Sequence, residues 1–433
     1  MIAKYRSVLS LPGAPGMFAS ALVARLPQGM AVIAILLLVR GATHSYAAAG
    51  AAVGASAFAT AGCAPLLGRL VDARGRRRVL LPLAGGQAVI YALLVVAAQS
   101  HAGAAVLIVL AAVSGALLPP VAPVVRVMLG EMFDDPDTRD TAYALEAVIQ
   151  EVLWITGPLV VALVVAFGSP AVAVGLLGAV CLGGTMLFLR SPWLRAEPAG
   201  AAVPRSERTS ALASPELRVL LAPIALTGAG LGAIEVGLPS LALHAGSRPA
   251  SGLLLAMWSV GSMAGGLWYG ARAWRSPLAR RYRMLLGLAV LCTAPLIAAH
   301  SIPAGVVCSL LAGLTIAPMF SCQYALVGRA VTAGSETEAF TWVSAALIGG
   351  LAAGSAIAGA VIGPGGVSAP FVVSCGATML AALLAVGVRA PSARRPGSRP
   401  AHGSAPADPA RPGTTPLAPP RPCRPAPPAA DRA

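Results

Sequence analysis

Charge is scarce in this sequence, and acidic residues are scarcer than basic ones. Charged residues make up 11% of the 433 positions, with 16 acids against 31 basic residues. Hydrophobic residues account for 57%, and the mean hydropathy is +0.78. A soluble domain of this length could not cover so much apolar side chain with polar groups. The composition therefore excludes a soluble protein and predicts an all-α protein that crosses the membrane many times.

Sequence signatures of membrane enzymes and pumps are also missing. The chain contains no P-loop, HExxH, G-x-S-x-G or Rossmann fingerprint, which argues against an ATP-driven pump or a membrane hydrolase. The seven cysteines show no CxxC or Cys/His spacing, so neither a disulfide framework nor a metal site is predicted. We therefore expect no enzymatic activity and no bound cofactor.

Twelve apolar stretches are long enough to span a membrane. Each has about 17–25 residues, which as a helix crosses roughly 30 Å of hydrocarbon. They lie near 17–39, 46–67, 79–99, 103–125, 142–167, 170–189, 219–243, 251–271, 284–299, 303–327, 339–362 and 367–388. Their division predicts two six-helix bundles over 17–189 and 218–389. The other segments are 1–16, a polar linker at 190–217 and a disordered Pro/Arg-rich tail at 390–433.

The distribution of basic residues predicts the orientation. With the N-terminus in the cytoplasm, the inner segments before residue 389 carry twenty of them, and the outer loops carry only Arg40 and Arg248. The positive-inside rule therefore places both termini in the cytoplasm. Topology then explains the net charge of +15, and no nucleic-acid partner is expected. We expect a monomeric, multi-pass protein of the inner (plasma) membrane, surrounded by the lipid bilayer.

The densest cluster of charge lies between the second and third stretches. Residues 68–80 read GRLVDARGRRRVL, with one acid among five arginines. Such charge cannot lie in lipid, so the segment must be a short, tightly turned aqueous loop. It resembles the loop between the second and third helices of the major facilitator superfamily, G-x-L-x-D-[RK]-x-G-[RK]-[RK]-x-x-L. Only Ala73, in the place of a basic residue, departs from that motif.

This resemblance, which covers about residues 15–390, implies a secondary transporter that works by alternating access. It assigns the segment to a cytoplasmic gating loop whose motif residues are Gly68, Leu70, Asp72, Arg74, Gly75, Arg76 and Arg77. Asp72 is expected to cap or pair with groups of the opposite bundle when the cytoplasmic side is closed. A carboxylate near a helix N-terminus contributes about 0.3–1 kcal/mol. The alternative is that the arginines only enforce topology.

The two halves of the chain repeat each other weakly, at an offset near 197–198 residues. The matching pairs are Gly68 and Gly265, Gly115 and Gly313, Pro120 and Pro318, and Gly157 and Gly354. Such duplicated bundles are the arrangement with which transporters build a site at the membrane midplane. In the second half Tyr269 stands in the place of Asp72, so the charged motif is complete only in the first half.

Four ionisable residues lie inside the predicted spans, where charge is costly and usually functional. Arg25 in the first span and Glu151 in the fifth are predicted to form a pair, and Glu146 lies roughly 140° around the helix from Glu151. Glu235 in the seventh span has no basic residue at its depth in its bundle, which makes it the best candidate for reversible protonation. The alternatives are a structural ion pair for Arg25 and a surface acid of the outer vestibule for Glu235.

Proline and glycine mark two predicted bends in the first bundle. Pro27 kinks the first span, and Gly157-Pro158 bends the fifth and allows a neighbouring helix to approach closely. This Gly-Pro pair is similar to the core of an antiporter motif of the superfamily. Leu153 replaces the leading glycine of that motif, so the pattern favours export only modestly.

The fourth span departs further from drug–proton antiporters, which usually carry an arginine followed by a glycine within this helix. Here Arg126 lies only at the cytoplasmic end, while Pro119 and Pro120 predict a broken helix that lines the cavity. Pro318 predicts the same in the tenth span, where Gln323 and Tyr324 are among the few polar groups.

A mostly apolar cavity with sparse polar groups suits a hydrophobic or amphipathic solute. The sequence therefore predicts a transporter that moves an apolar small molecule outward across the cell membrane in exchange for protons. One alternative is a uniporter or importer of a small metabolite. An alternative of another class is a membrane scaffold or sensor without transport activity, in which Glu235 and Arg25 would be dispensable.

Overall fold

The computed structural model describes residues 2–133, 135–195, 210–247, 249–331 and 334–388. The predicted tail at 390–433 and half of the predicted linker, residues 196–209, lie outside these residues. Every regular element in the described part of the chain is a helix, and twelve helical segments there are long and apolar enough to cross a membrane. The predicted all-α fold with twelve spans is confirmed.

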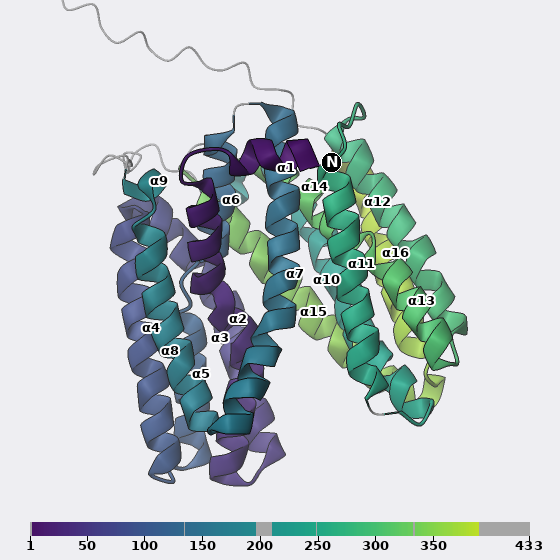
Figure 1. The fold of residues 1–433 in the computed structure, drawn as a ribbon. Helices are drawn as coiled ribbons and strands as arrows, with labels where there is room; N and C mark the ends of the chain where they lie inside the picture. The colour runs from purple at the N-terminus through teal and green to yellow at the C-terminus, as the bar shows by residue number, and fades with distance from the viewer. Residues whose placement is uncertain (1, 134, 196–209, 248, 332–333, 389–433) are drawn as a thin grey trace, which may run out of the picture. The chain divides into compact units, whose positions relative to one another are not determined.

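The N-terminal half contains six spans and two short helices. Its elements are α1 (Ile2–Leu9), α2 (Ala14–Thr43), α3 (Tyr46–Arg74), α4 (Arg76–Gln99), α5 (Ala104–Ala116), α6 (Val121–Met132), α7 (Pro136–Phe167), α8 (Pro170–Leu189) and α9 (Pro192–Arg195). Span four consists of α5 and α6 together. Figure 1 shows α1, in dark purple, across one end of the spans. This helix was not predicted from the sequence.

The C-terminal half repeats this order of spans. Its elements are the 3₁₀ turn η2 (Ala211–Ala213), α10 (Pro215–His244), α11 (Ala250–Gly270), α12 (Leu278–Thr293), η3 (Ala294–Ala298), α13 (Ile302–Gly313), α14 (Ile316–Ala330), α15 (Glu336–Gly365), α16 (Ala369–Leu384) and η4 (Ala385–Gly387). Span ten consists of α13 and α14. Two bundles of six spans are therefore present.

The helices begin and end where the local sequence favours it. Asp135 caps α7, since its carboxylate accepts hydrogen bonds from the Thr138 amide at 2.8 Å and the Thr138 hydroxyl at 2.6 Å. These hydrogen bonds hold the pKa of Asp135 below its usual value. Pro136 follows at the first helical position, where its missing N–H is not needed. The helix thus begins six residues before the stretch predicted at 142–167.

Gly75 alone separates α3 from α4. Its φ of +87° and ψ of 151° form a combination that is essentially restricted to glycine. The predicted loop over 68–80 is therefore wrong in extent, because residues 68–74 end α3 and residues 76–80 begin α4. Arginine is a good helix former, so both helices continue into the charged sequence.

Spans four and ten are both broken, as the prolines predicted. In span four α5 ends at Ala116, and Pro119 and Pro120 separate it from α6. In span ten the break falls at Leu314 and Thr315. Pro318 lies in the first turn of α14, where a helix tolerates proline.

Glycines pack equivalent helix pairs in the two halves. A Cβ atom on Gly157 of α7 would lie 2.5 Å from the carbonyl carbon of Gly29 on α2, and Gly354 of α15 meets the backbone of Ala229 on α10 in the same way. Gly115 of α5 similarly packs on α3, and Gly313 of α13 packs on α11. The weak sequence repeat therefore reflects a repeated packing scheme.

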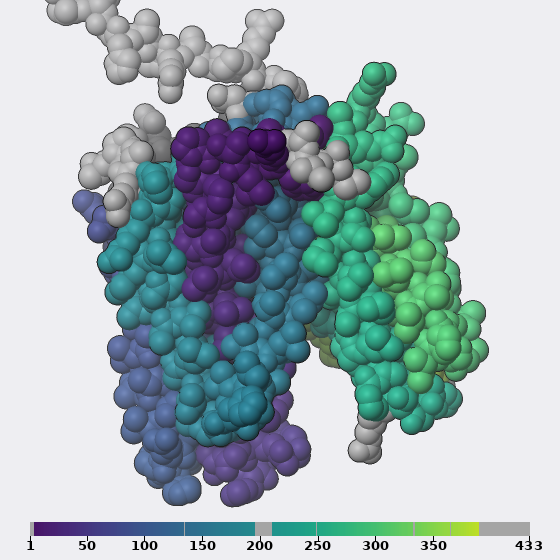
Figure 2. Space-filling view, viewed as in Figure 1, coloured from purple at the N-terminus to yellow at the C-terminus, as the bar shows by residue number. Residues whose placement is uncertain are grey.

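The two halves contact each other mainly through α3 with α15 and α7 with α11 and α14. Hydrogen bonds between the halves join the start of α7 to α11, α12 and α14, the end of α3 to the start of α15, and α1 to α11. In Figure 2 the N-terminal half, purple to teal, touches the green C-terminal half at the end where α1 lies, and a gap separates them toward the other end. We call the touching end the closed end.

Candidate functional site

Asp72 closes one side of the interface by capping a helix of the other half. Its Oδ1 accepts a hydrogen bond from the Thr337 amide at 3.1 Å, and its Oδ2 accepts one from the Glu338 amide at 2.8 Å. These amides belong to the first turn of α15, whose N–H groups have no partner within the helix. The aligned peptide dipoles add a partial positive charge there, which favours a carboxylate. The predicted contact of Asp72 with the opposite bundle is present.

The other motif residues support this contact or remain at the surface. A Cβ atom on Gly68 would collide with Thr341 and lie 2.9 Å from the Glu338 Cα, so glycine lets α3 approach α15 closely. Arg76 forms an ion pair with Glu131 of α6 at 2.6 Å, within its own half. Leu70 packs against the core, and Arg74 and Arg77 are exposed.

A second contact at the closed end was not predicted from the sequence. Asp140, near the start of α7, pairs with Arg281 of α12 at 2.8 Å and with Arg329 of α14 at 3.7 Å. Arg281 also donates a hydrogen bond to the hydroxyl of Tyr269 at 2.9 Å. Nearby, Thr141 donates to the Gly270 carbonyl at 2.9 Å. An acid of the first half is thereby held by two arginines of the second.

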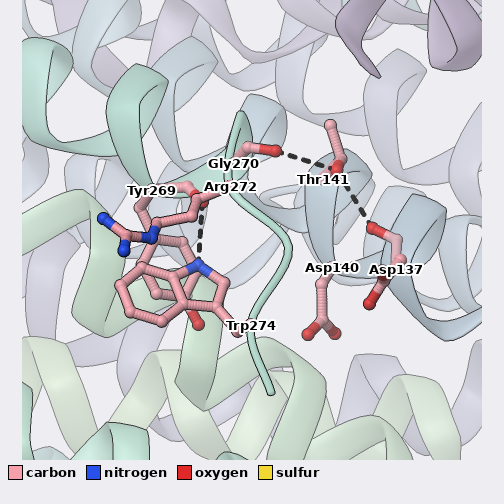
Figure 3. A pocket seen from close by; sticks show the side chains of 7 residues that line it. All are labelled: Asp137, Asp140, Thr141, Tyr269, Gly270, Arg272 and Trp274. Atoms are coloured by element: carbon pink, nitrogen blue, oxygen red, sulfur yellow. Dashed lines mark hydrogen bonds between the residues drawn. The ribbon is translucent and has the colours of Figure 1, made fainter. Parts of the chain in front are cut away.

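Figure 3 shows the small pocket beside this contact. Its lining residues are Asp137, Asp140, Thr141, Tyr269, Gly270, Arg272 and Trp274. The Tyr269 ring stacks on Trp274 with 5.0 Å between ring centroids, and the Trp274 indole donates to the Tyr269 carbonyl. The end of α11 thus meets the start of α7, as the end of α3 meets the start of α15. Tyr269, which stands in the place of Asp72, was the sequence signal that could have led to Asp140.

Helix α1 adds a third contact across the closed end. The Tyr5 hydroxyl donates to the carbonyls of Gly266 at 3.2 Å and Leu267 at 2.9 Å, both on α11. Partial burial raises the pKa of Tyr5 to about 12, so its hydroxyl keeps its proton at neutral pH. The residues 1–16, expected only as a cytoplasmic segment, therefore include a helix that bonds to the C-terminal half.

Next along the interface lies a buried ion pair. The Arg25 guanidinium donates to both carboxylate oxygens of Glu146, at 2.5 and 3.2 Å, and the two side chains are 2% and 0% exposed. The predicted pair of Arg25 with Glu151 is therefore wrong. Arg25 lies eleven residues into α2 and Glu146 ten residues into α7, so both are about 15 Å from helix starts on the same side. Glu151 lies about 7 Å farther along α7.

Arg126 joins this ion pair from α6. Its side chain is 5% exposed, its Nε lies 3.7 Å from Oε1 of Glu146, and its guanidinium carbon lies 4.0 Å from the ring centroid of Tyr324 on α14. The sequence placed Arg126 only at the cytoplasmic end of the fourth span, among residues that set topology. That assignment is wrong, because the helix break allows α6 to bring this side chain into the interface.

Aromatic rings surround Tyr324. The centroids of Phe320, Phe340 and Tyr143 lie 6.2, 6.4 and 6.4 Å from that of Tyr324. Gln323, expected to face the cavity, instead donates to the Tyr282 hydroxyl of its own half at 3.2 Å. Tyr324 thus meets the first half, and so does Ser321, whose hydroxyl donates to the Asp140 carbonyl at 3.4 Å.

Two further carboxylates lie on opposite halves, within electrostatic range of each other. Glu151 of α7 is 8% exposed and lies near the Ser262 hydroxyl of α11, within electrostatic range of Glu235 on α10. Glu235 has an exposed side chain. Among the described residues no basic side chain forms an ion pair with either acid, whereas Glu146 has two arginines nearby.

The predicted bend residues of the first bundle serve its packing. Pro27 is buried within α2, two residues before Gly29, on which Gly157 packs. Pro158 lies inside α7 next to that contact. The Gly-Pro pair thus marks the place where α2 and α7 approach most closely.

Solved transporter structures share this arrangement of helices. The crystal structure of the human organic anion transporter MFSD10 (TETRAN) matches 86% of this chain and 99% of its own, with 17% identity and a TM-score of 0.67. That of a bacterial homologue of the iron transporter ferroportin in an outward-facing state matches 87% of this chain and 99% of its own, with 13% identity and a TM-score of 0.68. At these identities the likeness concerns the fold.

No curated protein sequence matches this chain. The family model of the Major Facilitator Superfamily matches residues 17–296 and 224–427. The first range covers the first half, the linker and part of the second half, and the second range runs through the second half. The first of these ranges alone covers more than half of the sequence. Together with the twelve spans, this match shows that the chain is a multi-pass membrane protein that belongs to the Major Facilitator Superfamily.

Proposed function

We propose that this protein is a secondary transporter that exports apolar or amphipathic small molecules in exchange for protons. Membership of the superfamily and the transporter fold support membrane transport. The distribution of its basic residues supports an orientation with both termini in the cytoplasm, and we place the protein in the inner membrane as a monomer. The closed end then faces the cytoplasm.

The contacts at the closed end support alternating access. Asp72, Asp140 and Tyr5 each bond across the two halves there. All three contacts must break before the cytoplasmic side can open. The ferroportin homologue of the same fold was solved in an outward-facing state, which supports the same assignment for this conformation.

The observation that carries proton coupling is the pair of carboxylates on opposite halves, Glu151 and Glu235. An ionised carboxylate without a cationic partner costs several kcal/mol to enclose in a low-dielectric interior. Protonation removes that cost, and Glu235 is not enclosed by protein in this conformation. Closing the interface around these two acids therefore favours their neutral forms, and opening it favours proton release.

Flux into inverted vesicles with an imposed pH gradient tests this proposal, with a panel of amphipathic dyes as probes. We expect gradient-dependent accumulation by the wild type and a loss of at least tenfold in Glu151→Gln and Glu235→Gln. Glu216→Gln is the matched control, since Glu216 is an exposed acid at the start of the same helix as Glu235. It should transport like the wild type.

Two other results of this flux experiment would indicate different functions. Transport that ignores the pH gradient and survives both substitutions would indicate a uniporter. Inserted, folded protein that moves no probe under any gradient would favour a scaffold or sensor.

A further inference from the structure

The buried charges at the centre of the interface do not balance locally. Arg25 donates to both oxygens of Glu146, so this carboxylate is already neutralised by one arginine. The Nε atom of Arg126 is 3.7 Å from Oε1 of the same carboxylate, a distance that is too long for a hydrogen bond. The layer formed by Arg25, Glu146 and Arg126 therefore carries one positive charge in excess.

The guanidinium of Arg126 has unused hydrogen-bonding capacity. It donates no hydrogen bond to any described residue, and its Nε is buried without a partner. A guanidinium has five N–H donors in one plane, and a buried donor left unpaired costs about 1–3 kcal/mol or more when charged. The 4.0 Å contact with the Tyr324 ring uses the face of the guanidinium and leaves its edge available.

Arg126 also lies where both halves meet. Its helix α6 belongs to the first half, and Tyr324 belongs to α14 of the second. Phe320 and Phe340 pack beside Tyr324, and all three rings are buried between the halves in this conformation. A molecule bound here with a charged group and an apolar body would touch both halves, as alternating access requires.

Within the described residues, the remaining acids of the interface form no ion pair with this layer, and Glu151 lies within electrostatic range of Tyr324. Glu151 lies five residues beyond Glu146 on α7, about 140° around the helix, next to Ser262 of α11. Glu235 approaches from α10 with an exposed side chain. Neither acid forms an ion pair with Arg126 in the described part of the chain.

We propose that Arg126 binds the anionic group of the transported solute, and that the substrates are amphipathic organic carboxylates. The carboxylate receives paired N–H donors from the guanidinium edge, the geometry that arginine offers to carboxylates. The apolar body of the solute lies against Tyr324, Phe320 and Phe340. This inference rests on the proposed transport function and names its substrate class.

Binding to the purified full-length protein tests the inference independently of transport. The probes are a panel of aryl and alkyl carboxylates, including 1-naphthaleneacetate, each paired with its neutral amide and titrated by isothermal calorimetry at neutral pH. We expect the wild type to bind carboxylates at least tenfold more tightly than the matching amides. Arg126→Gln should abolish this preference, and Arg126→Lys should keep part of it.

Arg40→Gln is the matched control, because Arg40 also lies over a tyrosine ring, that of Tyr46, but on the exposed surface. It should bind like the wild type. Equal affinity of the wild type for acids and amides, or binding of neither, would overturn the inference even if Arg126→Gln fails to fold. A preference that survives in Arg126→Gln would overturn it as well.

Flux measurements separate this inference from the function on which it rests. Carboxylate binding with the expected dependence on Arg126, but without flux in vesicles, would uphold the site and contradict transport. Flux of neutral or cationic dyes with no carboxylate preference would uphold transport and contradict the site.

Discussion

Arg25 and Glu146 form an ion pair with almost no access to solvent. Both charges were removed from water on folding, and their two hydrogen bonds offset only part of that cost. Loss of Glu146 leaves two buried arginines, Arg25 and Arg126, without a counter-charge, whereas loss of Arg25 leaves Glu146 with Arg126 at 3.7 Å. Loss of both residues leaves Arg126 alone. The contribution of the pair to stability therefore depends on whether one or two residues are changed.

We predict that Glu146→Gln destabilises the protein by about 3–5 kcal/mol, and that Arg25→Gln costs less because Arg126 remains beside Glu146. The double variant should lose less than the sum of the two, because it keeps the same single excess charge as the wild type, that of Arg126. Thermal unfolding in detergent, followed by size-exclusion chromatography, measures this cycle. Asp137→Asn is the control, since Asp137 pairs with Lys4 at 4.0 Å at the surface and should change stability by at most about 1 kcal/mol. Additive losses in the double variant would show that the two side chains act independently.

The functional residue types could be predicted from the sequence, but their pairing could not. Arg25, Glu146, Glu151 and Glu235 were recognisable because ionisable side chains are rare within spans. The partner of Arg25 depends on where α7 begins, and the cap by Asp135 places that start six residues before the apolar stretch. A shift of six residues along a helix is about 9 Å, which is enough to exchange Glu151 for Glu146. Arg126 was missed because hydropathy does not show where a broken helix resumes.

At the scale of helices, the contact of α3 with α15 depends on two residues of α3, one turn apart. Gly68 allows the helices to approach, and Asp72 supplies the carboxylate that the first turn of α15 needs. The motif predicted the residues and the opposite bundle as the partner. It did not predict that the motif is helical on both sides of Gly75, because the charge density suggested an extended loop.

We predict that Asp72→Asn lowers transport at least tenfold while membrane insertion stays normal. Asparagine keeps the size of the side chain but loses the charge that interacts with the helix dipole, about 0.3–2 kcal/mol, and one of the two acceptor oxygens. Flux per inserted molecule in vesicles measures the effect. Arg74→Gln and Arg77→Gln serve as controls from the same motif, because both side chains are exposed and should matter only for topology. Wild-type flux in Asp72→Asn would contradict a gating role for this residue.

At the scale of the whole molecule, the duplicated halves explain why contacts occur in corresponding places with different chemistry. The start of α15 is held by Asp72 from the end of α3, and the start of α7 is held at the end of α11, where Asp140 meets Arg281 and Tyr269. Hydropathy and loop charges sufficed to predict twelve spans in two bundles. The second contact was not predicted, because Tyr269 takes the place of Asp72 at the end of α11 and the acid, Asp140, lies instead on α7 of the first half.

A native thiol lies behind this second contact and reports on its opening. The Cys322 side chain is buried and contacts the Tyr269 hydroxyl at 3.0 Å. We predict that Asp140→Asn increases the rate at which a membrane-impermeant maleimide labels Cys322 from the closed end several-fold, because Arg281 and Arg329 lose the charge that holds them. Arg281→Gln should have a similar effect. Mass spectrometry of labelled peptides distinguishes Cys322 from the other cysteines.

The charge exchange Asp140→Arg with Arg281→Asp tests whether the ion pair itself is responsible. If the pair closes this end, the double variant should label more slowly than either single variant, because opposite charges again face each other across the two halves. Asp137→Asn, at the surface in the same first turn of α7, should label like the wild type. Fast labelling in the double variant would show that the local geometry around Tyr269 matters more than the charge pair. Slow labelling of Cys322 in Asp140→Asn would instead place the closing force in the contacts of Asp72 and Tyr5.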